Sequence, residues 1–369
     1  MTNTSNNIPW IEKYRPRKLD DITQDDNLIA LFKNSIKTQN ISHFLFYGPP
    51  GTGKTSAILA IGREIFKDQF NNRVIEFNAS DDRGINAVRE KITHEAKKYV
   101  TNAIAEDGTQ LPSYKIIILD EADSMTDEAQ DALRVIIEEY STVTRFCFIC
   151  NYINKITDAI KSRCSVIYFK KLNNKCMLNK LNEIAVKESM VLQKKIINVI
   201  IDVSNGDMRK AIMLLQNLKY LYNFKKSIHK SFNTMNLKEL NFISNSHMAD
   251  DISEHVYESD IYDIAGCIDM AKAHDIISEV LICKKISEIV LLSKTIIATG
   301  YPIDNILSQL NKAILETDKL DDYQKAKIIK YSGKILLKIK ECANEYIQLL
   351  DYLVGINSIN CANPIFDII

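Results

Sequence analysis

The sequence predicts an α/β domain built on a parallel sheet, followed by a small helical domain and an all-helical C-terminal domain. Between residues 43 and 170, short apolar runs alternate with segments of helical pattern. Most of the runs are apolar nearly throughout, which is typical of parallel strands covered on both faces. After Leu172 no further strand pattern occurs, and a chain of 369 residues is long enough for two or three domains. We therefore expect domains at residues 1–172, 173–235 and 236–369.

The composition is that of a globular protein, with 46% hydrophobic residues. Its 47 basic residues balance 47 acidic ones, so any contact with nucleic acid needs a local patch or several subunits that pool small patches. No apolar run reaches the roughly 18 to 20 residues that cross a bilayer, and no secretory leader is recognisable. The eight cysteines lack the spacing of a disulfide framework, so we expect a soluble, intracellular protein.

Cys147 and Cys150 form the pattern C-x-x-C inside an apolar, strand-like run. Residues three apart in a strand face opposite sides, and no second pair occurs elsewhere to complete a metal site. Buried structural thiols are therefore favoured over a zinc site.

Two prolines bound the N-terminal segment from Pro9 to Pro16, which contains the single tryptophan, Trp10. Proline disfavours helical backbone at the residue before it, so we expect this segment to be extended.

A phosphate-binding loop pattern, G-x-x-x-x-G-K-[ST], lies between a predicted strand at 43–47 and a predicted helix at 56–66. Glycines let the backbone turn its N–H groups toward an anion, and the following helix directs its positive N-terminus at the same place. Lys54 is expected to bridge the β- and γ-phosphates of a nucleotide, and the Thr55 hydroxyl to hold Mg²⁺. A structural glycine turn is the alternative, which the flanking strand and helix disfavour. The pattern and the residue after it comprise Gly48, Pro49, Pro50, Gly51, Thr52, Gly53, Lys54, Thr55 and Ser56.

The alternation of strands and helices continues after the loop. Right-handed crossovers between parallel strands bring the strand ends, and therefore the ligand, to one edge of the sheet. The predicted strands lie at 73–78, 115–119, 144–151 and 166–169, and the predicted helices at 85–99 and 126–140.

Asp120 and Glu121 directly follow the apolar strand at 115–119. Buried carboxylates at a strand end are unfavourable unless they serve a cation. We therefore assign Asp120 to Mg²⁺ and Glu121 to polarising the attacking water. Asp123 is expected to cap or hydrogen-bond the next segment.

Three more polar residues can complete a hydrolytic site. Asn151 ends a strand expected beside Glu121, where a neutral amide can orient water; an Asn that satisfies local turn groups is the alternative. Arg163 precedes the last strand, and Arg209 lies early in a helix of the small domain. Either guanidinium can stabilise charge on a phosphoryl group, Arg163 in a neighbouring subunit. A solvated surface charge is the alternative for each arginine.

Basic side chains lie on two helices of the α/β domain, with Arg83 and Arg89 on or beside one and Arg134 on the next. Helix N-termini and a few basic groups bind phosphates weakly in one subunit and additively in a ring. A solvated charged face is the alternative, which the nearby Glu90 and Glu138 support.

The remainder of the chain has helical patterns. Residues 173–224 predict short helices with a cap-forming break at 204–207, and residues 225–250 are polar and predict a linker. Further on, residues from Ile328 to Leu350 recur at three- and four-residue steps as one long amphipathic stripe. Its apolar face can be buried within its own domain or against a neighbouring subunit.

These motifs together resemble the small subunits of replication factor C, the clamp-loading AAA+ ATPases. The resemblance spans about residues 8–220, and Ser-Arg-Cys at 162–164 is specific to clamp loaders. The segment 343–349 resembles a helix of the family's collar domain. The matching motifs are Pro9–Pro16, the phosphate loop, Phe77–Ile85, Leu119–Thr126, Thr144–Tyr152, Ser162–Cys164 and Asn205–Ala211.

The resemblance implies a P-loop AAA+ domain, a helical lid and a helical collar, with an ATP site at a subunit boundary. Asn151 and Arg209 then correspond to the two sensor residues, and Arg163 to an arginine finger inserted into the next subunit's site. The segment from Lys97 to Leu111 lies where family members touch the sliding clamp. The adenine would be lined by Ile11, Arg15 and Thr23, and DNA would be contacted by Arg83, Arg89 and Arg134.

The chain departs from the family at Val135, where a second arginine usually follows the one at Arg134. The departure concerns part of the grip on DNA, or the coupling from DNA to Glu121, that the resemblance otherwise implies.

The resulting hypothesis is a clamp-loader subunit that uses ATP and Mg²⁺. It would act in a hetero-oligomeric ring, expected to be a hetero-pentamer, that loads a sliding clamp onto primer–template DNA during DNA replication. The alternatives are a DNA-remodelling AAA+ motor that acts without a clamp, and a scaffold subunit that binds nucleotide without hydrolysing it. Richness in Ile, Asn and Lys suggests an A+T-rich genome of a protist or a large DNA virus. We therefore expect the protein in a eukaryotic nucleus or at a site of viral replication.

Overall fold

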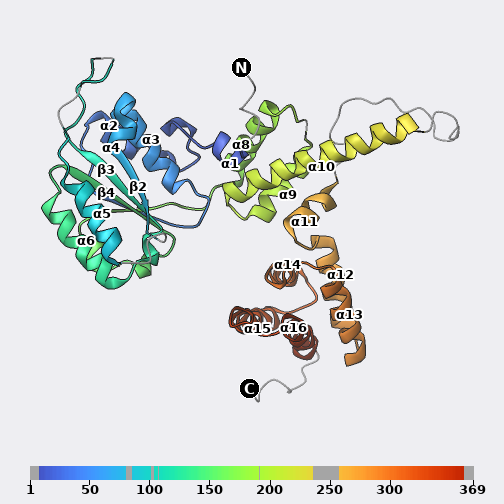
Figure 1. Ribbon diagram of the computed structural model, residues 1–369. Helices are drawn as coiled ribbons and strands as arrows, with labels where there is room; N and C mark the ends of the chain where they lie inside the picture. The colour runs from blue at the N-terminus through green and yellow to red at the C-terminus, as the bar shows by residue number, and fades with distance from the viewer. Residues whose placement is uncertain are drawn as a thin grey trace. The chain divides into compact units, whose positions relative to one another are not determined.

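The computed structural model describes residues 8–79, 85–100, 104–106, 108–190, 192–235 and 257–360. Contacts between Cα atoms divide the chain into two compact units, residues 1–216 and 217–369 (Figure 1). The first unit contains a parallel sheet with helices on both faces, followed by short helices; the second is helical in the part that the structure describes. The finer division into three domains stays a prediction.

Five parallel strands form the sheet in the order β2-β3-β4-β1-β5. The inner strands β3 and β4 are buried along nearly their whole length because helices cover both faces, whereas the edge strand β5 is mostly exposed. Every pairing is parallel, which confirms the predicted class. The strands are β1 (Phe44–Tyr47), β2 (Val74–Asn78), β3 (Lys115–Asp120), β4 (Thr144–Cys150) and β5 (Ser165–Tyr168).

Two hydrophobic clusters fill the two faces of the sheet. One cluster joins the sheet to α2 and α3 and includes Cys147, and the other joins it to α5, α6 and α7 and includes Cys150. The two thiols are buried on opposite faces, as predicted, and burial raises the pKa of Cys150 to about 12. The helices are α2 (Asp26–Lys37), α3 (Lys54–Phe66), α4 (Phe70–Arg73), α5 (Ile85–Lys97), α6 (Asp127–Glu139) and α7 (Asp158–Lys161), with short 3₁₀ turns at η2 (Leu19–Asp21), η3 (Lys67–Gln69), η4 (Ala122–Ser124) and η5 (Ile153–Lys155).

Helix α2 has no counterpart in the sequence prediction. The Asp25 side chain caps it by accepting a hydrogen bond from the N–H of Asn27. Leu28, Phe32 and Ile36 recur at four-residue steps and pack on the sheet. The capping residue and this spacing were the signals present in the sequence.

The prediction of an extended N-terminal segment is wrong. Trp10–Lys13 form one helical turn, α1, and the Pro9 carbonyl accepts the N–H groups of Glu12 and Lys13. Proline restricts its own φ and the residue before it, and it is well suited to the start of a helix. The residues between the two prolines were therefore free to coil. Trp10 is buried, and its backbone N–H donates to the Gln216 side chain at 3.1 Å.

Three further helices complete the first unit and lead into the second: α8 (Asn174–Lys187), α9 (Lys194–Ser204) and α10 (Met208–Met235). The predicted break between α9 and α10 is confirmed, because Asn205 adopts a left-handed backbone and Asp207 caps α10 by accepting the N–H groups of Arg209 and Lys210. The linker prediction is wrong over residues 225–235, where α10 continues. The rest of the predicted linker, residues 236–250, lies outside the described residues.

The second unit has one hydrophobic core to which α12, α13, α14, α15 and α16 all contribute. Within the described ranges of the chain, no helix is both long and apolar enough to cross a membrane. The helices are α11 (Glu258–Ala265), α12 (Met270–Ile282), α13 (Ile286–Ala298), α14 (Ile303–Glu316), α15 (Asp322–Lys340) and α16 (Glu345–Asn360).

The long amphipathic stripe predicted from Ile328 to Leu350 is divided between two helices, so that expectation is wrong. Helix α15 ends at Lys340, and Cys342 adopts a left-handed backbone with φ of 64°. The Ala343 N–H bonds back to the Lys338 carbonyl at 3.0 Å, which closes the helix end. The left-handed position after a helix is usually occupied by glycine. Here it is occupied by Cys342, so the sequence did not indicate that the helix ends. Ile328 is buried in the core of its own unit.

His43 precedes β1 and lies against the sheet with its ring partly buried. Its Nδ1 accepts a hydrogen bond from the Phe146 N–H at 3.1 Å, which requires an unprotonated nitrogen. Burial, with a smaller contribution from the charge of Arg145, lowers the pKa of His43 to about 4 from an ordinary value of 6.5. The folded chain therefore holds this imidazole neutral.

We predict that the first unit loses stability as the pH falls from 7 to 5. A folded pKa below the unfolded value gives stability that is present above pH 6.5 and is lost toward pH 4. Between pH 7 and pH 5 this shift corresponds to a loss of roughly 2 kcal/mol in the free energy of unfolding, which partial solvent access reduces to about 1 kcal/mol. Denaturant unfolding of His43→Asn should show less pH dependence, whereas His94→Asn, at an exposed position, should behave as the unsubstituted chain. Equal pH profiles for His43→Asn and the unsubstituted chain would contradict the prediction.

Candidate functional site

A cavity lies where strands β1, β3 and β4 end, at the carboxyl edge of the sheet. It is lined by the N-terminal segment, the phosphate loop, the ends of β3 and β4, and the start of α10. Most of the predicted site residues are brought together here, which is the placement expected for a ligand in a parallel sheet. They are Ile11, Arg15, Thr23, Pro50, Gly51, Thr52, Gly53, Lys54, Thr55, Ser56, Asp120, Glu121, Asn151 and Arg209.

The loop has the backbone that its glycines permit. Gly51 and Gly53 have φ of 68° and 90°, a left-handed conformation that side chains disfavour. A Cβ at Gly48 would lie 2.2 Å from the Phe169 carbonyl oxygen, so this position requires the absence of a side chain. Helix α3 begins at Lys54, immediately after the loop, and its N-terminus lies at the cavity.

The Lys54 side chain is buried inside the loop. Its Nζ donates to the carbonyls of Gly48 and Pro49, at 2.7 and 2.8 Å, and to Asn151 Oδ1 at 3.0 Å. Burial is the largest influence on its pKa, which is lowered, and the Asp120 carboxylate opposes that shift. A buried ammonium held only by neutral oxygens is a strong site for an anion. Gly48 and Pro49 do not line the cavity, but their carbonyl oxygens hold the Lys54 ammonium.

Asp120 and Thr55 contact each other at the wall of the cavity. The Thr55 hydroxyl donates to Asp120 Oδ2 at 2.8 Å, and the other carboxylate oxygen accepts the Glu121 N–H at 2.8 Å. Glu121 has a left-handed backbone with φ of 55° and an exposed side chain. Strain of this kind often marks functional positions. The turn is held by Ser124, whose N–H and hydroxyl both donate to the Glu121 carbonyl.

Asn151 is held from behind by Asp123. One Asp123 oxygen accepts the N–H groups of Asn151 and Tyr152, each at 3.2 Å. Asp123 thus forms hydrogen bonds, but with residues at the end of β4 and not with the next segment as predicted; the cap of α6 is Thr126. Because β3 and β4 are neighbours in the sheet, Asn151 lies beside the acidic pair at the end of β3.

The N-terminal segment and α8 are joined by a contact that the sequence analysis missed. Glu188 Oε1 accepts hydrogen bonds from the Tyr14 hydroxyl at 2.6 Å and from Lys13 Nζ at 2.5 Å. Tyr14 lines the cavity, so this pair fixes one of its walls. Tyr14 and Glu188 are 174 residues apart in sequence, and no local sequence pattern predicts a contact between residues so far apart.

Arg209 lines the cavity from the first turn of α10. The Met208 N–H donates to the Gly51 carbonyl at 3.3 Å, and Asp207 lies close against Gly51. The helix start and the phosphate loop are therefore in direct contact within the first unit. This contact brings Arg209, which the sequence could not place, to the same cavity as the loop.

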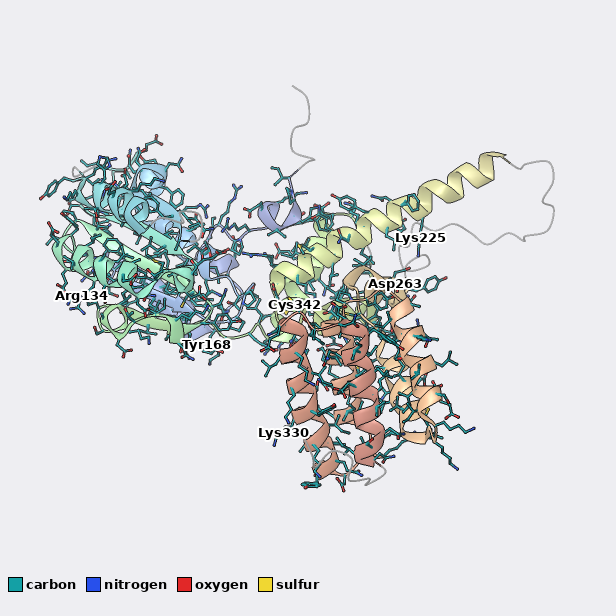
Figure 2. The ribbon with its side chains drawn as sticks, turned by 60° about the horizontal axis from the view of Figure 1, so that its bottom comes forward. Arg134, Tyr168, Lys225, Asp263, Lys330 and Cys342 are labelled. Atoms are coloured by element: carbon teal, nitrogen blue, oxygen red, sulfur yellow. The ribbon has the colours of Figure 1, made fainter. Side chains whose placement is uncertain are left out.

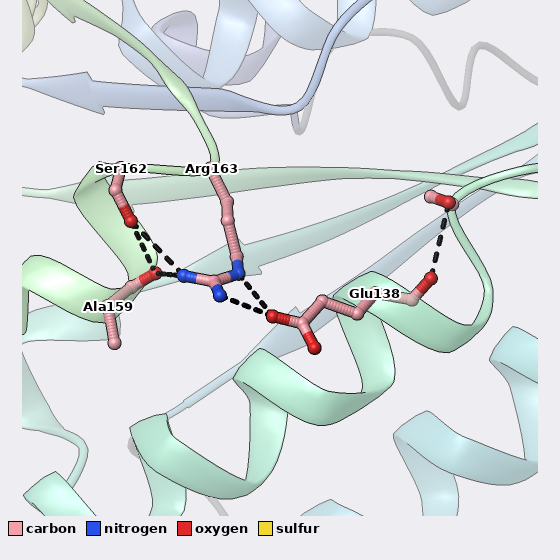
Figure 3. A network of polar contacts seen from close by, with 5 residues as sticks. Glu138, Ala159, Ser162 and Arg163 are labelled. Carbon is pink, nitrogen blue, oxygen red and sulfur yellow. Dashed lines mark hydrogen bonds and ion pairs between the residues drawn. The ribbon is translucent and has the colours of Figure 1, made fainter.

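Arg163 does not line the cavity. It precedes β5, whereas the phosphate loop follows β1, and these strands pair in parallel with Phe44 opposite Ser165 and Tyr47 opposite Tyr168. The paired stretch alone is about 10 Å long. Arg163 therefore lies at the opposite edge of the sheet, where its Nε donates to Glu138 Oε1 at 2.7 Å (Figure 3).

The residues predicted to contact DNA are only partly described. Arg83 and the Arg89 side chain lie outside the described residues. Arg134 is exposed on α6 (Figure 2), and Val135 beside it is 49% exposed. In the predicted clamp-contact segment, Tyr99 and Ile104 have exposed apolar side chains.

Comparison with known proteins gives matches over almost the whole chain. Three family models match in succession: "DNA polymerase III, delta subunit" at residues 24–173, "RCF1/5-like, AAA+ ATPase lid domain" at 179–219, and "Replication factor C C-terminal domain" at 269–354. A putative replication factor C small subunit of Acanthamoeba polyphaga mimivirus is 68% identical, covering 96% of this chain and 97% of its own length. Replication factor C subunit 2 of Schizosaccharomyces pombe is 39% identical (95% and 94%), and human replication factor C subunit 4 is 37% identical (93% and 86%).

Among solved structures, the RuvB Holliday junction branch migration motor of Thermotoga maritima is similar in fold. The TM-score is 0.51, with 14% identity over 73% of this chain and 80% of that one. This likeness concerns the fold alone.

We predict that Gly51→Ala destabilises the first unit more than Gly53→Ala does. Both substitutions force a side chain into a left-handed backbone, but a Cβ at Gly51 would also lie 1.7 Å from Asp207 Oδ1, while one at Gly53 meets nothing within 4 Å. Moving the Asp207 carboxylate removes the cap of α10, which costs about 1 kcal/mol. Thermal unfolding of the two variants should show this difference, and equal losses would contradict it.

Proposed function

Because this chain belongs to the replication factor C small subunits, we propose that it is an ATP-hydrolysing subunit of a clamp loader. It would act in a hetero-oligomeric ring, a hetero-pentamer, that loads a sliding clamp onto primer–template DNA. The similarity extends through the helical C-terminal region and is not limited to the AAA+ core. This extent favours a clamp-loader subunit over a self-sufficient DNA-remodelling motor. The retained hydrolytic residues favour an ATPase over a scaffold.

The cavity at the carboxyl edge of the sheet would bind ATP. Lys54 would exchange the loop carbonyls for the β- and γ-phosphate oxygens, and the N–H groups of the loop and of α3 would hold the same anion. The adenine would lie against the N-terminal segment near Ile11, Arg15 and Thr23. The Tyr14–Glu188 contact supports this proposal because it attaches that segment to the end of α8 and so fixes a wall of the cavity.

The Thr55 hydroxyl and the Asp120 carboxylate fit a Mg²⁺ site. They lie 2.8 Å apart beside the loop, and both offer the oxygen ligands that this ion prefers. When bound with ATP, Mg²⁺ would neutralise charge on the phosphate oxygens. The hydrogen bond between Thr55 and Asp120 keeps both groups in position beforehand.

Hydrolysis would proceed by attack of a water molecule on the γ-phosphorus. The Glu121 carboxylate would accept the proton of that water, and the Asn151 amide would orient it. Asp123 holds the Asn151 backbone and so keeps the amide beside Lys54. Arg209 would contact the phosphate from the lid side.

Arg163 would act on the ATP of a neighbouring subunit. The observation that carries this proposal is its place at the amino edge of the sheet, beyond reach of the loop of its own chain. A guanidinium there can stabilise the transition state only in trans. The site would therefore be completed between two subunits.

DNA would be held by contributions from several subunits. With a net charge of zero, a single chain attracts DNA weakly. Arg134, exposed on α6, would contact a phosphate, and Arg83 and Arg89 would add to this contact. The protein would act in the nucleus of a eukaryote or at a site of viral DNA replication.

We predict that Lys54→Ala weakens ATP binding by about ten- to a hundredfold, because it removes charge-assisted hydrogen bonds to phosphate. Titration with a fluorescent ATP analogue measures the effect. Lys37→Ala, which removes an exposed positive charge from α2, serves as the control and should bind as before. Unchanged affinity in Lys54→Ala would place the nucleotide elsewhere.

We predict that Arg163→Ala leaves ATP binding by its own chain unchanged but slows turnover at the neighbouring site at least tenfold. Phosphate release by the assembly purified with its partner subunits, in the presence of clamp and DNA, measures this turnover. Lys161→Ala removes a positive charge from the same segment and should have little effect. Intact turnover in Arg163→Ala would contradict the assignment in trans.

A further inference from the structure

All three nitrogens of the Arg163 guanidinium contact acceptors of its own chain (Figure 3). Nε donates to Glu138 Oε1 at 2.7 Å, and a second nitrogen pairs with the same oxygen. Nη1 donates to the Ala159 carbonyl at 2.8 Å and to the Ser162 hydroxyl at 3.1 Å. The planar fork is thus directed at α6 and at the C-terminal end of α7.

Glu138 is the one anion in this network. It lies in the last turn of α6, and its side chain is 50% exposed, while that of Arg163 is 31% exposed. Glu139, the next residue, has its carboxylate on the Tyr140 hydroxyl instead. The ion pair therefore contributes little to the fold, and water can compete for both partners.

While two nitrogens of Arg163 contact Glu138, the same two nitrogens cannot contact a phosphate. A carboxylate and a phosphoryl group are both anions that prefer the same two-pronged contact. Glu138 and the γ-phosphate of a neighbour would therefore compete for one side chain. Because exposed ion pairs are weak, Glu138 would delay the transfer of Arg163 to the phosphate without preventing it.

We propose that Glu138 is a positioning residue that retains Arg163 on its own subunit until a neighbour's phosphate displaces it. This inference rests on the proposed role of Arg163 in trans. Glu138 thus lowers the fraction of time that the guanidinium spends at the neighbouring site. Arg163 engages that site when the phosphate of a well-assembled neighbour outcompetes the carboxylate.

The test compares Glu138→Gln with the matched control Glu139→Gln in the assembly purified with its partner subunits. Gln keeps the size and a hydrogen-bond acceptor but removes the charge. The measured quantity is the part of kcat for ATP hydrolysis that Arg163→Ala abolishes. We expect Glu138→Gln to raise this part about two- to fivefold with KM unchanged, which is the range of a weak surface ion pair. Glu139→Gln should leave it unchanged.

A double variant separates positioning from a structural effect. In the Arg163→Ala background, Glu138→Gln should change nothing, because its effect passes through the guanidinium. In the isolated chain, phenylglyoxal should modify Arg163 faster in Glu138→Gln than in Glu139→Gln, as measured by mass spectrometry of the peptide.

The outcomes distinguish this inference from the proposed function. If Arg163→Ala lowers turnover but Glu138→Gln behaves as Glu139→Gln or falls, the retaining role of Glu138 is wrong while the finger role stands. An effect of Glu138→Gln that persists without Arg163 also overturns the inference. If Arg163→Ala leaves turnover intact, the role in trans and the inference both fail.

Discussion

The parallel direction of all five strands is the constraint on which the rest of the structure depends. It gathers every strand end at one edge and every strand start at the other. The phosphate loop, Asp120 and Asn151 follow strand ends, whereas Arg163 precedes a strand. One chain therefore carries the cradle and the guanidinium on opposite edges. Under the proposed function, this topology makes hydrolysis a property of two adjacent subunits.

Buried basic residues in the first unit fall into two kinds. The Lys115 ammonium donates to the Glu95 and Lys98 carbonyls, where it stabilises the C-terminal end of α5, and Arg73 donates to the Pro112 carbonyl. These contacts link elements of the fold, and neither Lys115 nor Arg73 lines the cavity at the carboxyl edge of the sheet. Lys54 also holds carbonyls, but those carbonyls belong to a loop that faces a cavity. Burial alone thus does not identify a functional charge, whereas burial beside a cavity does.

The sequence predicted what depends on local pattern. Short, mostly apolar runs predicted all five strands within a residue or two, and the loop glycines predicted the backbone that the structure has. One wrong prediction arose where a single residue decides the backbone: Cys342 ends α15 without glycine. Contacts between distant residues, such as Tyr14 with Glu188 or Arg163 with Glu138, follow from the packing of whole elements. No single stretch of sequence contains them.

Lys54 and Arg163 would both bind phosphate, but they differ in burial and in the oxygens that hold them beforehand. Each is held by oxygens of its own chain and would exchange them for phosphate. Lys54 is buried in a backbone cradle, so its position is fixed and phosphate finds the site already formed. Arg163 is partly exposed and pairs with a solvated carboxylate, so its exchange depends on a second subunit. ATP would thus bind to one chain first. Hydrolysis would begin only when Arg163 of the correct neighbour has left its own carboxylate for the phosphate.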